Sequence, residues 1–127
     1  MWPFKKKSKT TEQPVQSVVV EHAVIVHTGS SSVSIEQVYE LSDSLRDILE
    51  RQNIGELDGH EIAVSGSDAV FYLYGPNARS LYLEIEEILK LHEITKTGTA
   101  YLRFGDASDA GALEIEINIV DGLPDVH

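Results

Sequence analysis

The sequence predicts an α+β fold, a ferredoxin-like two-layer sandwich in the element order β-α-β-β-α-β-β with a mostly antiparallel sheet. Three observations predict it: short β-branched or alternating apolar runs, two longer stretches with apolar residues at helical spacing, and glycine- or serine-rich turns between them. The length of 127 residues suits one domain. We expect a flexible basic tail over residues 1–14, a single α+β domain over residues 15–121 and a C-terminal tail over residues 122–127.

The first strand is expected over residues 17–28, SVVVEHAVIVHT, which is apolar at both alternating sets of positions. Two apolar faces are typical of a central strand in a covered sheet, or of a strand near an oligomer contact. After Gly29, a helix is expected to start at Ser34, because Ser34 and Gln37 match a capping box, and to end near Asn53. Its apolar stripe consists of Val38, Leu41, Leu45, Ile48 and Leu49.

A hairpin and a second helix are expected next. Residues 55–59 are expected to form a connection, 61–64 a short strand, 65–68 a turn and 69–74 the return strand. The Gly-Pro pair at 75–76 ends that strand, and proline suits the first turn of the following helix. The apolar stripe of this helix consists of Ala78, Leu81, Ile85, Ile88 and Leu89.

Two more strands close the chain. Residues 99–104 form the first, and the loop GDASDAG leads into ALEIEINIV, where apolar residues alternate with polar ones. If both helices cover one side of the sheet, each strand must turn its apolar side toward them. The expected inner residues are Phe71, Leu73, Leu102, Phe104, Leu113, Ile115, Ile117 and Ile119.

The opposite side of the sheet is the candidate functional surface. Tyrosine offers contact area at low entropic cost and keeps a polar group, so tyrosines among carboxylates suit a protein-binding surface. An ordinary solvated sheet face and a homodimer formed across the same face are the alternatives. The expected partner-binding residues are Tyr72, Tyr74, Tyr101, Arg103, Glu114 and Glu116.

The charge of the chain narrows the class of partner. Ten Lys and Arg stand against 21 Asp and Glu, and four of the lysines lie within residues 5–9. From Thr10 onward the chain therefore holds 6 basic and 21 acidic residues, a balance of −15. Such a body repels phosphate backbones, which argues against nucleic-acid binding, and attracts a basic protein partner.

The N-terminal residues also bear on membranes. Trp2 and Phe4 beside the lysines suit contact with an anionic membrane surface, but one short basic patch does not give stable membrane association. The apolar run at 17–28 is interrupted by Glu21 and His22 and is far shorter than the ~20 residues of a membrane span.

The sequence offers little for catalysis or for a metal. It has no cysteine, no G-x-S-x-G elbow and no phosphate-binding loop motif. His22 and His27 are expected on opposite faces of one strand. The best acid–base candidates are Asp58, His60 and Glu61, but neighbouring strand residues diverge. We therefore expect no catalytic residues, no metal and no cofactor.

Three short motifs carry a resemblance. Residues 58–61 match D-G-x-E, residues 74–76 match Y-G-P and residues 103–105 match R-[YF]-G, all within residues 55–119. In these motifs the chain resembles a family of short, uncharacterised bacterial α+β proteins. In size and charge it more loosely resembles the acidic immunity proteins of bacterial toxin systems.

The resemblance and the charge together favour a non-enzymatic protein-binding module of the bacterial cytoplasm. An immunity protein that occludes a basic toxin domain is the specific form that we expect. The alternative is a homodimeric regulatory module that binds a small ligand.

Overall fold

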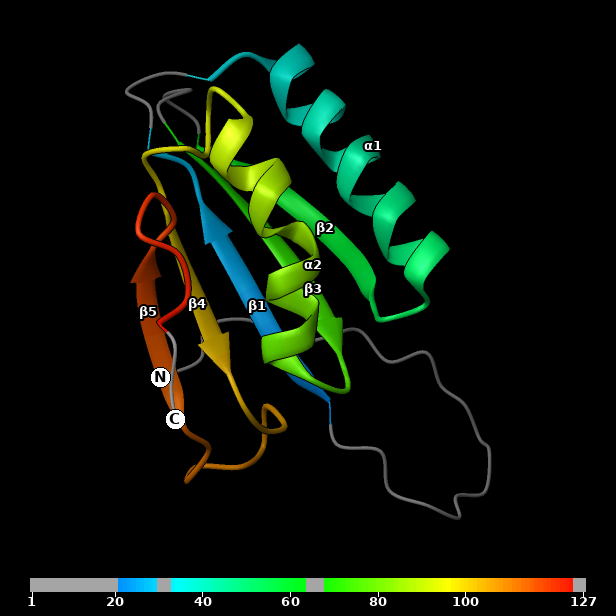
Figure 1. The fold of residues 1–127 in the computed structure, drawn as a ribbon, viewed down its shortest axis with the longest axis vertical. Coiled ribbons are helices and arrows are strands. Elements are labelled where there is room, and N and C mark those ends of the chain that lie inside the picture. Colours follow the sequence, from blue (N-terminus) through cyan, green and yellow to red (C-terminus); the bar gives the residue numbers. More distant parts are fainter. Residues whose placement is uncertain (1–20, 30–32, 64–67, 125–127) are drawn as a thin grey trace.

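The computed structural model describes residues 21–29, 33–63 and 68–124. Within these ranges the chain forms five strands and two helices (Figure 1), and the expected element order and α+β class are confirmed. The elements are β1 (His22–His27), α1 (Ile35–Gln52), β2 (Glu56–Ile62), β3 (Ala69–Gly75), α2 (Ala78–Leu91), β4 (Thr99–Arg103) and β5 (Glu114–Asn118).

The strands form one open sheet in the order β2-β3-β1-β4-β5. Every neighbouring pair is antiparallel, as the sequence predicts. Both helices lie on the same side of the sheet (Figure 1): α1 packs on β2, while α2 packs on β1, β3 and β4. The helices also contact each other, so the described chain has one sheet layer and one helix layer.

The strand β1 lies at the centre of the sheet, as its two apolar faces predict. Val24 and Val26 are fully buried in the core beneath the helices. Ile25 points to the other side and is still only 5% exposed. Its cross-strand neighbours are Tyr72 on β3 and Tyr101 on β4, whose large side chains flank it. Burial on both sides of the strand accounts for its β-branched sequence.

Capping signals set the ends of the helices. The Ser34 hydroxyl accepts the Gln37 N–H at 3.1 Å, and the Gln37 side chain accepts the Ser34 N–H at 3.1 Å, which confirms the capping box. Asn53 ends α1 with a φ of 53°, in the left-handed region that asparagine tolerates. Asn77 caps α2, so Pro76 precedes this helix and does not lie in its first turn.

The start of β2 differs from the prediction. Asp58 and Gly59 do not lie in a connection, because β2 already begins at Glu56. The pairing of β2 with β3 shifts by one residue between Leu57 and Gly59, and Asp58 is the extra residue of this β-bulge. The bulge accommodates a polar Asp-Gly pair inside a strand while Leu57 stays in the core.

The inner residues of the sheet agree with the prediction at every position except one. Phe71, Leu73 and Leu102 are fully buried. Leu113, in contrast, is 62% exposed, because it precedes β5 in the loop at the outer edge of the sheet. The remaining expected inner residues, Phe104, Ile115, Ile117 and Ile119, belong to the core or pack against it.

Several predicted segments lie partly or wholly outside the described residues. Residues 1–14, residues 17–20 of the expected first strand and most of the expected turn at 65–68 lie outside the described residues. At the C-terminal end Gly122 is buried, and the Leu123 N–H donates to the Glu86 carboxylate at 3.0 Å. The chain therefore packs onto α2 as far as Leu123.

Two glycines allow the α1–β2 connection to approach the end of β3. A Cβ atom at Gly75 would lie 2.4 Å from the Ile54 carbonyl oxygen, and one at Gly55 would lie 2.4 Å from the Tyr74 carbonyl oxygen. Both contacts are with backbone, which cannot move aside as a flexible side chain can. The glycine of the Y-G-P motif is therefore required by a close approach of two backbones.

We predict that Gly75→Ala lowers the free energy of unfolding by roughly 1–3 kcal/mol, the usual cost of forcing extra volume into a packed site. Gly111→Ala is the matched control, because a Cβ atom there would lie 3.7 Å from its nearest neighbour. That variant should change stability by less than about 0.5 kcal/mol. Urea unfolding measures both values, and equal midpoints for the two variants would contradict the close approach.

Candidate functional site

The candidate site is the side of the sheet that faces away from the helices, which we call the open face. Alternate residues of each strand enter the core, so the residues between them lie on this side. The strand register arranges them in three cross-strand rows. The rows are Glu56–Tyr74–Ala23–Arg103–Glu114, Gly59–Tyr72–Ile25–Tyr101–Glu116 and Glu61–Val70–His27–Thr99–Asn118.

All six residues expected to bind a partner lie in the first two rows. They come from β3, β4 and β5, and the register brings them together although up to 44 positions separate them in the sequence. The structure therefore places them side by side on one face. Their contact with a partner stays a prediction.

Phenol–carboxylate hydrogen bonds organise the open face. The Tyr72 hydroxyl donates to Glu61 Oε1 at 3.0 Å, and the Tyr101 hydroxyl donates to Glu114 Oε1. Burial, followed by the hydrogen bond and the charge of Glu61, raises the pKa of Tyr72 to about 12. The hydrogen bond to Glu114 is the main cause that raises the pKa of Tyr101. Both phenols therefore stay protonated and act as donors at neutral pH.

The same hydrogen bond affects the carboxylate. Donation from Tyr101 is the main cause that lowers the pKa of Glu114, and the neighbouring Arg103 guanidinium lowers it further. A carboxyl group whose pKa is lowered is ionised across the neutral range. Glu114 thus keeps its negative charge while Tyr101 keeps its proton.

Tyr74 is more deeply placed than the other two tyrosines. Burial is the main cause that raises the pKa of its hydroxyl, and the charges of Asp58 and Glu21 raise it further. Asp58 lies at the β-bulge of β2, and Glu21 directly precedes β1. Acidic groups from two segments of the chain therefore favour the protonated form of the Tyr74 phenol.

Arg103 holds the loop between β4 and β5. It is 5% exposed, and its guanidinium donates to the Asp106 carbonyl from Nε at 3.2 Å and from Nη2 at 2.9 Å. It also donates to the Asp109 carbonyl and forms an ion pair with Glu114. These contacts fold the loop back onto the sheet edge, so the guanidinium performs a structural task that the sequence did not reveal.

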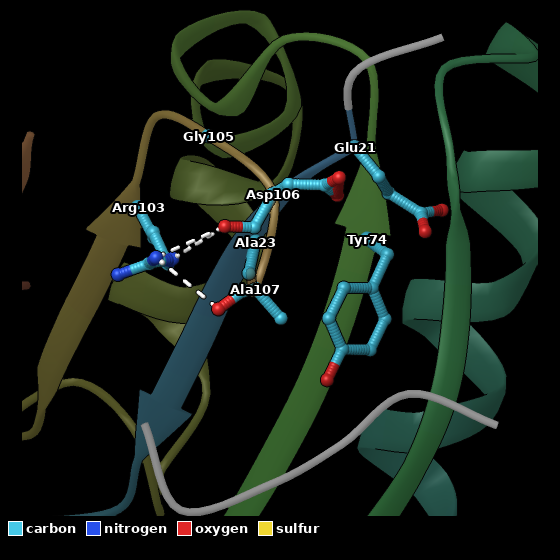
Figure 2. Close-up of a pocket in the computed structure, with 7 residues that line it drawn as sticks. All are labelled: Glu21, Ala23, Tyr74, Arg103, Gly105, Asp106 and Ala107. Atoms are coloured by element: carbon cyan, nitrogen blue, oxygen red, sulfur yellow. Dashed lines mark hydrogen bonds between the residues drawn. The ribbon is translucent and has the colours of Figure 1, made fainter. Parts of the chain in front are cut away.

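A small pocket lies where this loop meets the start of β1 (Figure 2). Its volume is about 40 Å³, and Glu21, Tyr74, Arg103 and Asp106 contribute to its lining. Figure 2 shows the Glu21 and Asp106 carboxylates on the same side of this pocket. Sites for small-molecule ligands usually measure about 300–1,000 Å³, so this hollow suits water or the tip of one side chain.

The histidine–carboxylate candidate of the sequence is divided between the two sides of the sheet. Glu61 lies on the open face, whereas His60 packs beneath α1, where its Nδ1 is 3.0 Å from the Ser42 hydroxyl. His60 lies between the rings of Tyr39 and Phe71, with centroid distances of 5.5 and 5.9 Å. The expected divergence of His60 and Glu61 is confirmed.

The Ser42–His60 pair is a contact that sequence reasoning missed. The sequence signal was a serine directly beside the apolar stripe of α1. In the structure this serine is only 2% exposed. A buried hydroxyl needs a hydrogen-bonding partner, and His60 provides one. The pair lies within the packed layer between helix and sheet, so we interpret it as structural.

The two histidines of β1 divide as expected for a strand. His22 lies on the helix side, where its Nδ1 accepts the Ala78 N–H at 3.0 Å at the start of α2, and His27 lies on the open face. Within residues 21–29, 33–63 and 68–124, no three His, Asp or Glu side chains gather in a way that could hold a metal ion.

Neither described helix is both long enough and apolar enough to cross a membrane. No protein-family model matches the chain, and comparisons with curated proteins and with solved structures also find no match. The site must therefore be interpreted from its own geometry.

We predict that Arg103→Ala lowers the free energy of unfolding by about 1–3 kcal/mol, because it removes the ion pair with Glu114 and leaves the Asp106 and Asp109 carbonyls without their donor. Arg103→Lys should recover only part of this loss, since lysine keeps the charge but not the planar set of donors. Chemical unfolding measures stability, and hydrogen exchange in residues 104–112 reports the loop. Unchanged exchange in the alanine variant would contradict the anchoring role.

We also predict an alkaline loss of stability that depends on Tyr72. The pKa of Tyr72 is raised in the folded state, so its contribution to stability is full below the unfolded value of 10 and is lost as the pH rises through about 12. Tyr72→Phe should reduce this loss in urea unfolding between pH ~9 and ~12. The same pH dependence in both proteins would show that Tyr72 is not the group responsible.

Proposed function

We propose that this protein is a non-enzymatic binding module whose open face docks a basic protein. One observation supports this most strongly: Tyr72 and Tyr101, each bonded to a carboxylate, share with further carboxylates a sheet face that no described helix covers. Tyrosines contribute area and hydrogen bonds, and carboxylates attract and orient a cationic partner.

The distribution of charge supports a basic partner. Of the six Lys and Arg side chains in the described residues, Arg103 alone lies on the open face, and Glu114 neutralises it. The other five lie on the helices or in the segment after α2. The carboxylates on or beside the open face are Glu21, Glu56, Asp58, Glu61, Glu114 and Glu116.

The hydrogen bonds of the face favour tight binding. Tyr72 and Tyr101 are each held by a carboxylate before any partner arrives, so less side-chain freedom is lost on docking. Each of these carboxylates has further lone pairs that can accept from lysine or arginine. The face is therefore arranged in advance for donors carried by another protein.

The non-enzymatic assignment rests on the same contacts. Tyr72 and Tyr101 are paired with Glu61 and Glu114, and the pocket beside Tyr74, at about 40 Å³, is too small for an ordinary substrate. In its specific form, the proposal is an immunity protein of the bacterial cytoplasm that blocks the substrate groove of a basic toxin domain. The mechanism is steric and electrostatic occlusion.

We further infer that the fold is a variant of the ferredoxin-like sandwich. The support is that β1 lies between β3 and β4, each helix follows a central strand, and β5 adds to the β4 edge. In this interpretation β5 enlarges the open face by contributing Glu114 and Glu116.

The test uses a charge-reversed bait, Glu61→Lys with Glu116→Lys, because both side chains are exposed and neither contacts the anchored loop. Proteins retained from a bacterial lysate by the wild type are identified, and the affinity of the retained basic protein is measured by calorimetry. We predict at least a ~10-fold loss of affinity in the double variant and a clear weakening of wild-type binding by salt.

The matched control is Glu84→Lys with Glu87→Lys, which makes the same charge change on exposed positions of α2. This control should retain binding within about three-fold, as expected for distant surface charges. Equal losses in both double variants would contradict docking on the open face. A wild-type dimer that the open-face variant dissociates, with no protein partner, would instead favour the homodimeric regulatory module.

A further inference from the structure

We propose that the basic segment of residues 2–9 docks in cis on the open face of its own chain. This segment contains Trp2, Phe4 and four lysines at positions 5, 6, 7 and 9, and it lies outside the described residues. Docking of this kind goes beyond partner binding, because it makes the chain a ligand of its own surface.

Charge complementarity is the first argument. Four of the ten basic residues of the chain lie within residues 5–9, and the remainder of the chain carries a balance of −15. On the open face, the carboxylates Glu56, Glu61 and Glu116 belong to three successive rows. A segment with several closely spaced cations can therefore contact more than one carboxylate at a time.

The place where the described chain begins is the second argument. Glu21 precedes β1, the central strand, and lines the pocket beside Tyr74 and Arg103 (Figure 2). The segment is therefore joined to the sheet at the end of its middle strand, and not at a distant corner. Two strands flank β1 on each side, so the open face extends in both directions from this point.

The length of the connection is the third argument. Residues 10–20 separate the last lysine of the segment from Glu21, and eleven residues span at most about 36–40 Å. The six residues of β1 extend over only about 20 Å. The lysines can therefore reach every row of the open face from their own attachment point.

Aromatic side chains provide a further match between the basic segment and the open face. The segment carries two aromatic side chains followed by four lysines, and the open face carries both tyrosines and carboxylates. Lysine attracts both a carboxylate and the face of an aromatic ring, and aromatic side chains pack on tyrosine. Trp2 and Phe4 thus have partners on the open face in addition to the charges.

A tethered segment also has a concentration advantage. A short tether gives an effective concentration on the order of millimolar, so weak contacts suffice to occupy the face. This step rests on the proposed function: a basic protein partner must displace the segment before the partner can dock on the open face. The segment would then reject weak cationic competitors and admit a partner that binds more tightly.

The experiment uses the full chain and needs no partner, so its outcome is independent of the proposed function. Trp2 is the only tryptophan of the protein, and its fluorescence reports the segment directly. Quenching of Trp2 by acrylamide is compared between the wild type and a variant with Lys5, Lys6, Lys7 and Lys9 changed to Gln. We expect quenching about three-fold weaker in the wild type at ~0.01 M salt and equal values at ~1 M salt, where screening is nearly complete.

The location on the open face is tested by the two charge-reversed pairs. Glu61→Lys with Glu116→Lys should raise Trp2 quenching to the value of the lysine variant, whereas Glu84→Lys with Glu87→Lys should leave the wild-type value. If the first pair fails to fold, Glu116→Gln alone should give a partial rise. The variant with the four lysines changed to Gln leaves every described residue unchanged, so folding of the domain does not limit the comparison with the wild type.

Three results would overturn the proposal. Trp2 quenching that is the same in the wild type and the lysine variant at low salt would show that the segment is not docked. Equal effects of the two charge-reversed pairs would show general attraction to the acidic body and no docking on the open face. Protection of Trp2 that rises with protein concentration would assign the segment to a second copy of the chain.

Discussion

The two-residue periodicity of the strands, combined with helices on one side only, is the constraint on which the rest of the structure depends. Every strand side chain that does not point toward the helices must then lie on the open face. At the centre, β1 has apolar residues on both sides, and Ile25 forms a buried floor between Tyr72 and Tyr101. The polar groups therefore surround a buried apolar centre, and strand register sets which of them are neighbours.

Local patterns in the sequence were sufficient to predict the helices, the strands and much of the inner side of the sheet. The capping box at Ser34 and the alternation in 113–119 involve residues within a few positions of each other, so they could be recognised without knowing the fold. The same applies to Tyr72 and Tyr74, which are two positions apart on one strand. The bulge at Asp58, the Ser42–His60 contact and the anchoring by Arg103 depend on chain segments that meet only in three dimensions. No local pattern specifies such contacts.

The electrostatics of the open face combine two opposing effects. Carboxylates gathered on one surface repel one another, which lowers the stability of the isolated protein. Phenol donors from Tyr72 and Tyr101 offset part of this cost without removing charge, because a neutral hydroxyl stabilises an anion and leaves it negative. Arg103 removes charge at one point only, where it is needed to hold the loop. The result is a surface that remains strongly acidic and yet is ordered.

The bulge in β2 has a consequence for behaviour at high concentration. β2 is an outer strand, and an outer strand with a regular row of backbone groups invites lateral addition of a strand from another molecule. The extra residue Asp58 interrupts that regularity and places a charge there. The opposite margin, β5, carries Glu114 and Glu116. Both borders of the sheet therefore resist the edge-to-edge growth that leads to fibrils.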